Sequence, residues 1–204
     1  MRLILIRHGH VDGINPPRFR GRADLPLTKL GERQAVATAE RLRASTHPVA
    51  LYSSPQRRAV ATASAIGAAL DLDVQTVPGF ADIDYGKWQG FSRDELPQYS
   101  AEIDLWFRAP QFASIEGGES LADVAARVGH VLGALNRLHP EDEIVLVGHD
   151  SVNRVALLSA IGAPISSYWS IRQDPCAINE IEFELTVPEA RTVVRLVNDT
   201  WHLR

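Results

Sequence analysis

The sequence contains one cysteine, Cys176, among its 204 residues. A single cysteine cannot form a disulfide within the chain, so a fold stabilised by internal disulfides is excluded. No sequence motif typical of a catalytic cysteine surrounds it in Gln173-Asp174-Pro175-Cys176. We therefore predict that Cys176 is a small, buried apolar side chain.

Long hydrophobic segments are also absent. The first apolar run, Leu3 to Ile6, is too short for a signal peptide or a membrane-spanning helix. No later stretch approaches the required length. We therefore expect a cytoplasmic protein that does not associate with a membrane.

The chain has no excess of positive charge, and its formal net charge is −4. A nucleic-acid-binding surface would need a basic stripe, so a nucleic-acid partner is not expected. Hydrophobic residues make up 45% of the chain and charged residues 23%, which is ordinary for a globular protein. The length suits a single domain spanning residues 1–204.

Strand and helix patterns alternate along the chain. Apolar runs predict strands at residues 3–6, 49–52, 74–77 and 143–147. Alternating patterns predict two late strands at 178–185 and 192–197. Whether these late strands pair in an antiparallel manner is left open. Helices are predicted at residues 28–45, 54–70, 120–139 and 151–161, with Thr28, Ser54 and Ser120 as capping residues. This alternation predicts an α/β fold, a three-layer sandwich with a mainly parallel central sheet.

Two segments do not fit this alternation. Residues 9–27 are rich in Gly, Pro and Arg and predict a long irregular loop, which in a compact domain is usually functional. Residues 78–118 hold most of the aromatic residues and many turn residues. We interpret them as an insertion with short helices that forms a cap over the rest of the domain.

Unusual polar residues follow three of the predicted strands. Arg7, His8 and His10 follow the first, Arg57 and Arg58 the second, and His149 with Asp150 the strand at 143–147. Ligands of open α/β sheets bind outside the carboxyl ends of the strands. We therefore expect these residues to converge on one site.

Arg58 falls in the first turn of a predicted helix, where the helix dipole disfavours a cation. An anionic ligand would reverse this penalty, because the helix amides and the guanidinium would then act on the same charge. Adjacent arginines cannot share one direction on a helix. We therefore predict that Arg58 points into the site and that Arg57 bends into solvent.

Two arginines and two histidines around an anion suit a phosphoryl group. Guanidinium groups bind phosphate oxygens through paired hydrogen bonds and stay charged. A neutral histidine can attack phosphorus, and a nearby carboxyl group must protonate the leaving oxygen. Asp82 and Asp84, in the aromatic-rich insertion, are the candidates for that acid.

Five motifs in order along nearly the whole chain resemble those of the histidine phosphatase superfamily, the phosphoglycerate mutase-like proteins. They are Arg7-His8-Gly9 after the first strand, Pro26-Leu27-Thr28 with Gly31, Gln34 and Ala35, Ser53-Ser54-Pro55-Gln56-Arg57-Arg58-Ala59, Asp82 ahead of Gly86, Trp88 and Gly90, and Val147-Gly148-His149. Gly117-Gly118-Glu119-Ser120 adds a further similar turn.

The resemblance implies that His8 attacks phosphorus and forms a phosphohistidine. It implies that Arg7, Arg58 and His149 hold the phosphoryl oxygens, and that Asp82 protonates the leaving alcohol. The phosphoenzyme is then hydrolysed by water, with no metal and no cofactor. We add Asn15 and Gly21 as substrate-binding candidates, expect a small phosphorylated substrate as the partner, and leave open a homodimer.

The sequence departs from the family pattern near the nucleophile. His10-Val11 stand where many members have Glu-Thr, and the family's loop asparagine aligns with Ile14, one place before Asn15. Asp82 is one methylene shorter than the glutamate of many small members. Asp150 replaces a common glycine, and we expect its charge to raise the pKa of His149. Asn153 and Arg154, which follow it, are expected to support the site without touching the substrate.

Three alternatives stand beside the phosphatase interpretation. The first is a phosphoglycerate mutase that depends on 2,3-bisphosphoglycerate, although mutases of the family tend to be longer. The second is a metal-dependent hydrolase, because His8-x-His10-x-Asp12 has a metal-ligand spacing, but no further ligand set is evident. The third is a binding module that has lost its chemistry, against which the intact set of His8, Arg58, Asp82 and His149 argues.

Overall fold

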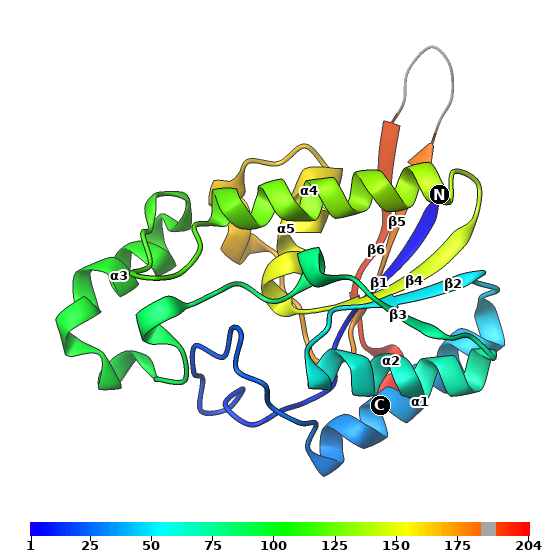
Figure 1. Cartoon of the computed structure of the whole chain (residues 1–204), viewed down its shortest axis with the longest axis horizontal. Coiled ribbons are helices and arrows are strands. Elements are labelled where there is room, and N and C mark those ends of the chain that lie inside the picture. The colour runs from blue at the N-terminus through cyan, green and yellow to red at the C-terminus, as the bar shows by residue number, and fades with distance from the viewer. Residues whose placement is uncertain (185–190) are drawn as a thin grey trace.

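The computed structural model of the chain describes residues 1–184 and 191–204, and its centre is a six-stranded sheet in the order β3-β2-β4-β1-β5-β6 (Figure 1). The strands are β1 (Arg2–Arg7), β2 (Ala50–Ser53), β3 (Val74–Thr76), β4 (Glu143–Gly148), β5 (Ile178–Glu184) and β6 (Arg191–Asp199). The first four are parallel, whereas β5 is antiparallel to β1 and β6 is antiparallel to β5. The predicted mainly parallel sheet is confirmed. Leu185, the last residue of the strand predicted at 178–185, lies outside the described residues.

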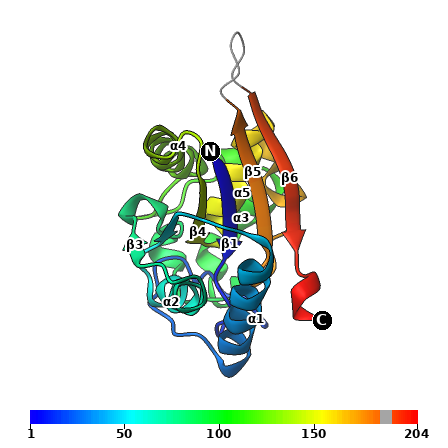
Figure 2. The ribbon, with the colours of Figure 1, turned by 90° about the vertical axis from the view of Figure 1, so that its right-hand side faces the viewer.

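Helices cover both faces of the sheet. They are α1 (Lys29–Ser45), α2 (Arg57–Leu70), α3 (Ser100–Arg108), α4 (Leu121–Leu138) and α5 (Asp150–Ala160). Ile4 and Ile6 of β1 pack with residues of α1 and α2, whereas Leu3 and Leu5 pack with residues of α4 and α5. Figures 1 and 2 show the strands between α4 on one side and α1 with α2 on the other. The predicted three-layer sandwich is therefore confirmed.

Two of the predicted helix starts are confirmed in detail. The Thr28 hydroxyl accepts a hydrogen bond from the backbone N–H of Gly31 at 3.2 Å, ahead of α1. Ser120 and Asp123 form a reciprocal capping box ahead of α4. These bonds satisfy backbone donors that the first turn of a helix leaves unpaired.

The prediction that Ser54 caps the second helix is wrong. The helix α2 begins at Arg57, and Gln56 precedes it without a side-chain capping bond. The Ser54 hydroxyl accepts a long bond of 3.4 Å from the backbone N–H of Gln56, which lies ahead of the helix, and it lies 2.7 Å from Nε2 of His149. The shorter contact of this hydroxyl is therefore tertiary.

The carboxyl ends of the central parallel strands meet at one edge of the sheet. Arg7 at the end of β1 is in register with Gly148 at the end of β4, and Ser53 of β2 is in register with Val147. The loop of residues 9–27 and the insertion of residues 78–118 lie beside each other at this edge (Figure 1). The backbone of Phe19 bonds to Phe91 at 2.9 Å and to Gly90 at 2.8 Å, which joins the two segments.

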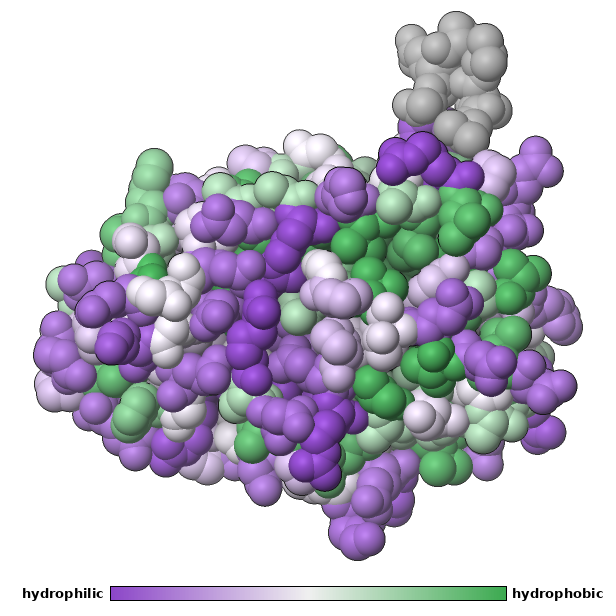
Figure 3. Space-filling view, viewed as in Figure 1, coloured by the Kyte–Doolittle hydropathy of each residue, from purple (hydrophilic) through white to green (hydrophobic). Residues whose placement is uncertain are grey.

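The insertion contains α3 and several short 3₁₀ turns. Trp88, part of its glycine-flanked motif, is fully buried in the core, and so is Cys176, as predicted. Over the face that carries α2 and α4, hydrophilic and hydrophobic residues are interspersed (Figure 3). Among the residues that the structure describes, no helix is both long and apolar enough to cross a membrane.

Candidate active site

The turn after β1 places His8 at the edge of the sheet and holds it there from several sides. The backbone N–H of His8 donates to the carbonyl of Gly148 at 3.0 Å, and the N–H of Gly9 donates to the hydroxyl of Thr62 at 3.0 Å. A Cβ atom added at Gly9 would lie 2.6 Å from the carbonyl oxygen of Gly31. The close approach of α1 therefore requires glycine after His8.

The hydrogen bonds of His8 define its tautomer. Its Nδ1 lies 2.7 Å from the carbonyl oxygen of Gly9, which can only accept, so Nδ1 carries the hydrogen. The Nε–H of Arg58 donates to Nε2 of His8 at 3.1 Å, so Nε2 presents its lone pair. Burial, followed by the charges of Arg58, His149 and Arg7, lowers the pKa of His8 well below its usual value. The ring is therefore neutral, with a free-base nitrogen facing the arginine.

Arg58 points inward and is fully buried, whereas Arg57 is exposed, as predicted. Two backbone carbonyls of the loop accept from its guanidinium, Ala23 at 2.6 Å and Gly21 at 2.8 Å. The same group donates to Oδ2 of Asp82 at 3.1 Å. Arg58 thus links the loop of residues 9–27, the imidazole of His8 and the carboxylate of Asp82.

His149 comes from the end of β4, and its ring centroid lies 5.1 Å from that of His8. Its Nδ1 is buried without a hydrogen-bond partner and lies 3.7 Å from Oδ2 of Asp82. Burial and the charge of Arg58, with further arginines, lower the pKa of His149 well below its usual value. The expectation that Asp150 raises this pKa is wrong, because burial and the arginines lower it, and the Asp150 carboxylate is paired with Arg154 at 2.5 Å.

The carboxylate of Asp82 is held on both oxygens. Its Oδ1 accepts from the hydroxyl of Ser151 and from the backbone N–H of Ile83, and its Oδ2 accepts from Arg58. The carbonyl of Asp82 accepts from Arg22 at 2.8 Å and from Arg127 at 3.2 Å. These bonds fix the carboxylate beside Arg58 and His149.

Arg7 lies in the same cluster and is only 5% exposed. Its Nη1 donates to the carbonyl of Gln173, its Nε is buried without a partner, and burial lowers its pKa. The side-chain amide of Asn153 is oriented so that its oxygen and its nitrogen both form hydrogen bonds. The oxygen accepts from the backbone N–H of Arg7 at 3.2 Å, and the nitrogen donates to the carbonyl of His149 at 3.1 Å. Asn153 therefore supports the two strand ends, as the sequence predicted.

A cavity of about 370 Å³ opens beside this cluster. Its lining residues are Arg7, Ile14, Pro17, Arg18, Phe19, Arg20, Tyr85, Arg93, Trp106, Phe107, Asp150, Arg154, Trp169, Arg172, Gln173 and Asp174. Asp82 instead lines a small hollow of about 30 Å³, which shares Arg18, Arg20, Tyr85 and Asp150 with the large cavity. His8 is 1% exposed and lines neither space, so Arg7 and Asp82 are the members of the cluster that reach them.

Gly21 and Asn15, the two predicted substrate contacts, lie in different surroundings. The carbonyl of Gly21 accepts from Arg58 and, at 2.9 Å, from the side chain of Gln56, so this buried glycine orients the arginine. Asn15 is exposed and is not among the residues that line the cavity, whereas Ile14 is. A phosphate contact from Asn15 stays a prediction.

The alternative metal ligands do not come together. Nδ1 of His10 lies 2.9 Å from the hydroxyl of Thr28, while His8 is bound to Arg58 and Gly9. Within residues 1–184 and 191–204, no group of three His, Cys, Asp or Glu side chains is arranged to hold a metal ion.

Several polar residues that hold the site are not among those predicted from the sequence. Ser54 contacts His149, Gln56 accepts from the backbone of Asp82, and Ser151 donates to the Asp82 carboxylate. Gln56 and Ser151 lie within two residues of a predicted site residue, and Ser54 lies four residues before Arg58. That proximity along the chain is the signal that could have found them.

Known proteins similar to this chain match it over most or all of its length. The model of the histidine phosphatase superfamily (branch 1) matches residues 3–200. The chain is 31% identical over 204 residues to phosphoserine phosphatase 1 of Hydrogenobacter thermophilus, covering 100% of this chain and 94% of that protein. It is 35% identical over 167 residues to glucosyl-3-phosphoglycerate phosphatase of Mycobacterium tuberculosis, covering 78% and 74% of the two chains. The solved structure of mycobacterial glucosyl-3-phosphoglycerate phosphatase superposes with a TM-score of 0.87 at 26% identity, covering 98% of this chain and 99% of that one.

Proposed function

Because this chain belongs to the histidine phosphatase superfamily (branch 1), we propose that it hydrolyses a small phosphomonoester through a phosphohistidine formed on His8. The observation that carries the proposal is the state of His8. Its Nε2 is unprotonated and faces Arg58, while Nδ1 is tied to the carbonyl of Gly9. A neutral imidazole held in one tautomer among cationic groups is suited to attack a phosphorus atom.

In the first step, the lone pair of His8 Nε2 forms a bond to phosphorus and the bond from phosphorus to the ester oxygen breaks. Arg58 transfers its Nε–H bond from His8 to a phosphoryl oxygen, and Arg7 contributes its unpartnered Nε. His149, once protonated beside the phosphate dianion, donates its Nδ1–H. Fixed donors that meet the developing charge stabilise the transition state.

The leaving oxygen takes the proton of the Asp82 carboxyl group. Asp82 lies 3.7 Å from Nδ1 of His149 and bonds to Arg58, so it faces the same phosphoryl position. In the second step, Asp82 accepts a proton from water, the water oxygen bonds to phosphorus, and the phosphorus–His8 bond breaks. Inorganic phosphate leaves, and both side chains return to their starting states.

The small size of the cavity supports a small substrate. Its volume of about 370 Å³ is near the lower end for ligand pockets. The named substrates of two relatives, phosphoserine and glucosyl-3-phosphoglycerate, are small phosphomonoesters. We extend that class, and no single compound within it, to this chain.

The proposal is tested by substitution of the nucleophile. His8→Ala should abolish phosphate release from p-nitrophenyl phosphate and should remove the acid-labile phosphoenzyme that is trapped by rapid quenching of the native protein with a labelled substrate. His130→Ala, which changes an exposed histidine of α4, is the matched control. A phosphoenzyme that persists in His8→Ala would place the nucleophile elsewhere.

Two further measurements separate the alternatives. We propose that the positive charge of Arg7, Arg58 and His149 replaces a metal, so activity should survive EDTA. Loss of activity on chelation, restored by zinc or manganese, would contradict that part. Isomerisation of 3-phosphoglycerate that requires 2,3-bisphosphoglycerate and releases no net phosphate would favour a mutase.

A further inference from the structure

The cavity beside the catalytic cluster is basic, although the chain has a net charge of −4. Six of its lining residues are arginines and two are aspartates. Aromatic rings form much of the rest of the wall. The phosphoryl group belongs with His8, so the cavity surrounds the part of a substrate that leaves.

Most of these arginines already have a carboxylate partner. The pairs are Arg18 with Glu95 at 2.8 Å, Arg93 with Asp104, Arg154 with Asp150 at 2.5 Å, and Arg172 with Asp174 at 2.8 Å. Among the described residues, only Arg7 and Arg20 of the cavity arginines have no carboxylate oxygen within 4.0 Å. Arg7 adjoins the nucleophile, so Arg20 is the cation left for the leaving group.

Among the described residues, the hydrogen bonds of Arg20 leave one edge of its guanidinium without a partner. Nη1 donates to the carbonyls of Gly13 at 2.6 Å and of Arg18 at 3.4 Å. Nε is buried and has no partner, and within the described part of the chain Nη2 makes no hydrogen bond. The Nε–H and Nη2–H groups are parallel, and their spacing matches the two oxygens of a carboxylate.

Arg20 is also placed at the junction of the two spaces. It lines the large cavity together with Arg7 and lines the small hollow together with Asp82. A group bound to Arg20 would therefore lie close to the ester oxygen that Asp82 protonates. The anion must be a near neighbour of that oxygen in the substrate.

We propose that Arg20 binds a carboxylate of the leaving group, so that the substrate is the phosphate ester of a hydroxy acid. A carboxylate is the better match than a second phosphate, because one unpaired guanidinium balances a single negative charge. The aromatic wall accommodates the carbon skeleton of the acid. This inference rests on the proposed phosphatase function and specifies its substrate.

The test uses pairs of substrates that differ at the carboxylate. O-phosphoserine is compared with O-phosphoethanolamine, and 3-phosphoglycerate with glycerol 3-phosphate. The native enzyme should have the higher kcat/KM on the carboxylated member of a pair. In Arg20→Gln that preference should fall by about 10- to 100-fold, the range expected for a hydrogen bond to a charged group. Most of the change should appear in KM, because the contact is present before the transition state.

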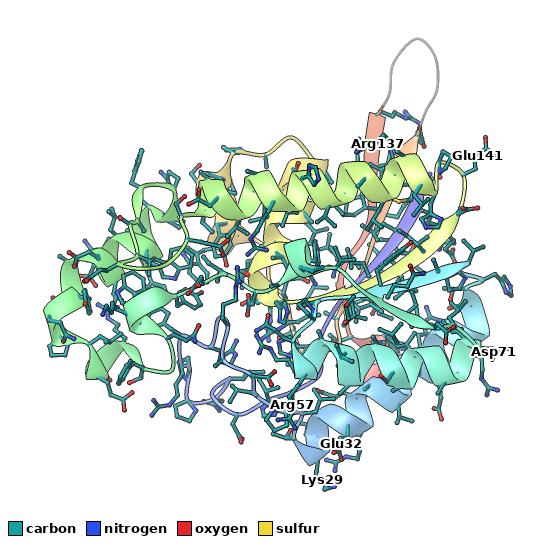
Figure 4. All side chains as sticks on the ribbon, viewed as in Figure 1. Lys29, Glu32, Arg57, Asp71, Arg137 and Glu141 are labelled. Carbon is teal, nitrogen blue, oxygen red and sulfur yellow. The ribbon has the colours of Figure 1, made fainter. Side chains whose placement is uncertain are left out.

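Two variants accompany Arg20→Gln. Arg20→Lys should keep only part of the preference, because an ammonium is a point charge without the paired donors. Arg57→Gln removes the same charge from an exposed side chain at the start of α2 and should keep the native preference (Figure 4). Thermal unfolding of each variant checks that the fold persists.

Several outcomes would overturn the inference. They are a native enzyme without preference for carboxylated substrates, equal losses on both members of each pair, and a stronger preference for a bisphosphorylated substrate that depends on Arg20. Hydrolysis of p-nitrophenyl phosphate in the same preparation would leave the phosphatase function standing in each case. Failure to hydrolyse any phosphomonoester would remove both proposals together.

Discussion

At the scale of single residues, the environment of Asp82 bears on the step that it is proposed to catalyse. Three donors hold its two carboxylate oxygens, and one of them is the guanidinium of Arg58. A phosphate entering between His8 and Arg58 competes with Asp82 for that guanidinium. Substrate binding would thus release Oδ2 of Asp82, the oxygen nearest His149, from its bond to Arg58.

The proton that Asp82 donates should raise kcat/KM more when the leaving group is more basic. Asp82→Asn is expected to lower kcat/KM for an alkyl phosphomonoester by roughly 10²- to 10⁴-fold, the usual contribution of a general acid. The loss on p-nitrophenyl phosphate should be much smaller, because p-nitrophenolate leaves without a proton. Steady-state kinetics on both substrates checks this. Equal losses would mean that Asp82 holds the site together and does not donate the proton.

The residues that could be predicted from the sequence are those whose roles follow from local chemistry. A cation in the first turn of a helix needs an anion, which predicts that Arg58 points inward, and Arg58 is fully buried. The pKa of His149 could not be predicted from its neighbour Asp150. The charges that lower it come from Arg58 and Arg7, which are distant in the sequence.

At the scale of the elements, the capping box at the start of α4 is a local interaction outside the catalytic cluster. Ser120→Ala should remove the hydrogen bond that the Ser120 hydroxyl accepts from the backbone N–H of Asp123 and lower the free energy of unfolding by about 1 kcal/mol. Activity per folded molecule should stay at the native level. Urea denaturation and kinetics on the same preparation test both parts. A fall in kcat would show that the start of α4 is coupled to the adjacent turn at Glu119, which bonds to Arg127.

The comparison of Ser120 with Ser54 explains why some element boundaries were predicted and others were not. The partner of Ser120 lies three residues away, so the sequence pattern contains the whole interaction. The Ser54 hydroxyl has a long local bond to the backbone of Gln56, but its short contact is with His149, which reaches it only because β2 and β4 are neighbours in the sheet. The fold class can be predicted from the periodicity of apolar residues. The start of α2 can be predicted only when the order of the strands in the sheet is known.

At the scale of the whole molecule, the fold gathers buried cations and neutral histidines at one edge of the sheet. His8 is 1% exposed and His149 is 0% exposed, and burial together with the arginines lowers the pKa of both. An unfolded chain has neither influence, so its histidines titrate near the ordinary value of about 6.5. The arrangement that keeps the nucleophile neutral therefore makes stability depend on pH.

The direction of that dependence follows from the protons bound in each state. Below about pH 6.5 the unfolded chain protonates both histidines, whereas the folded chain keeps them neutral until the pH reaches their lowered pKa values. The contribution of each histidine to stability is present above pH 6.5 and is lost as the pH falls. Each should add up to about 1.4 kcal/mol per pH unit to the slope of the unfolding free energy within that window.

Urea denaturation of the native protein and of His8→Asn and His149→Asn between pH 7.5 and about pH 5.5 measures the slope. Each substitution should remove one titrating group and flatten the curve, whatever it does to stability at neutral pH. His47→Asn, which changes an exposed histidine, should leave the slope at its native value. Saturating inorganic phosphate should also flatten the curve of the native protein, because a bound anion favours protonated His149 in the folded state. A native slope that persists in His149→Asn would mean that another buried group carries the pH dependence and that the arginine cluster does not keep His149 neutral.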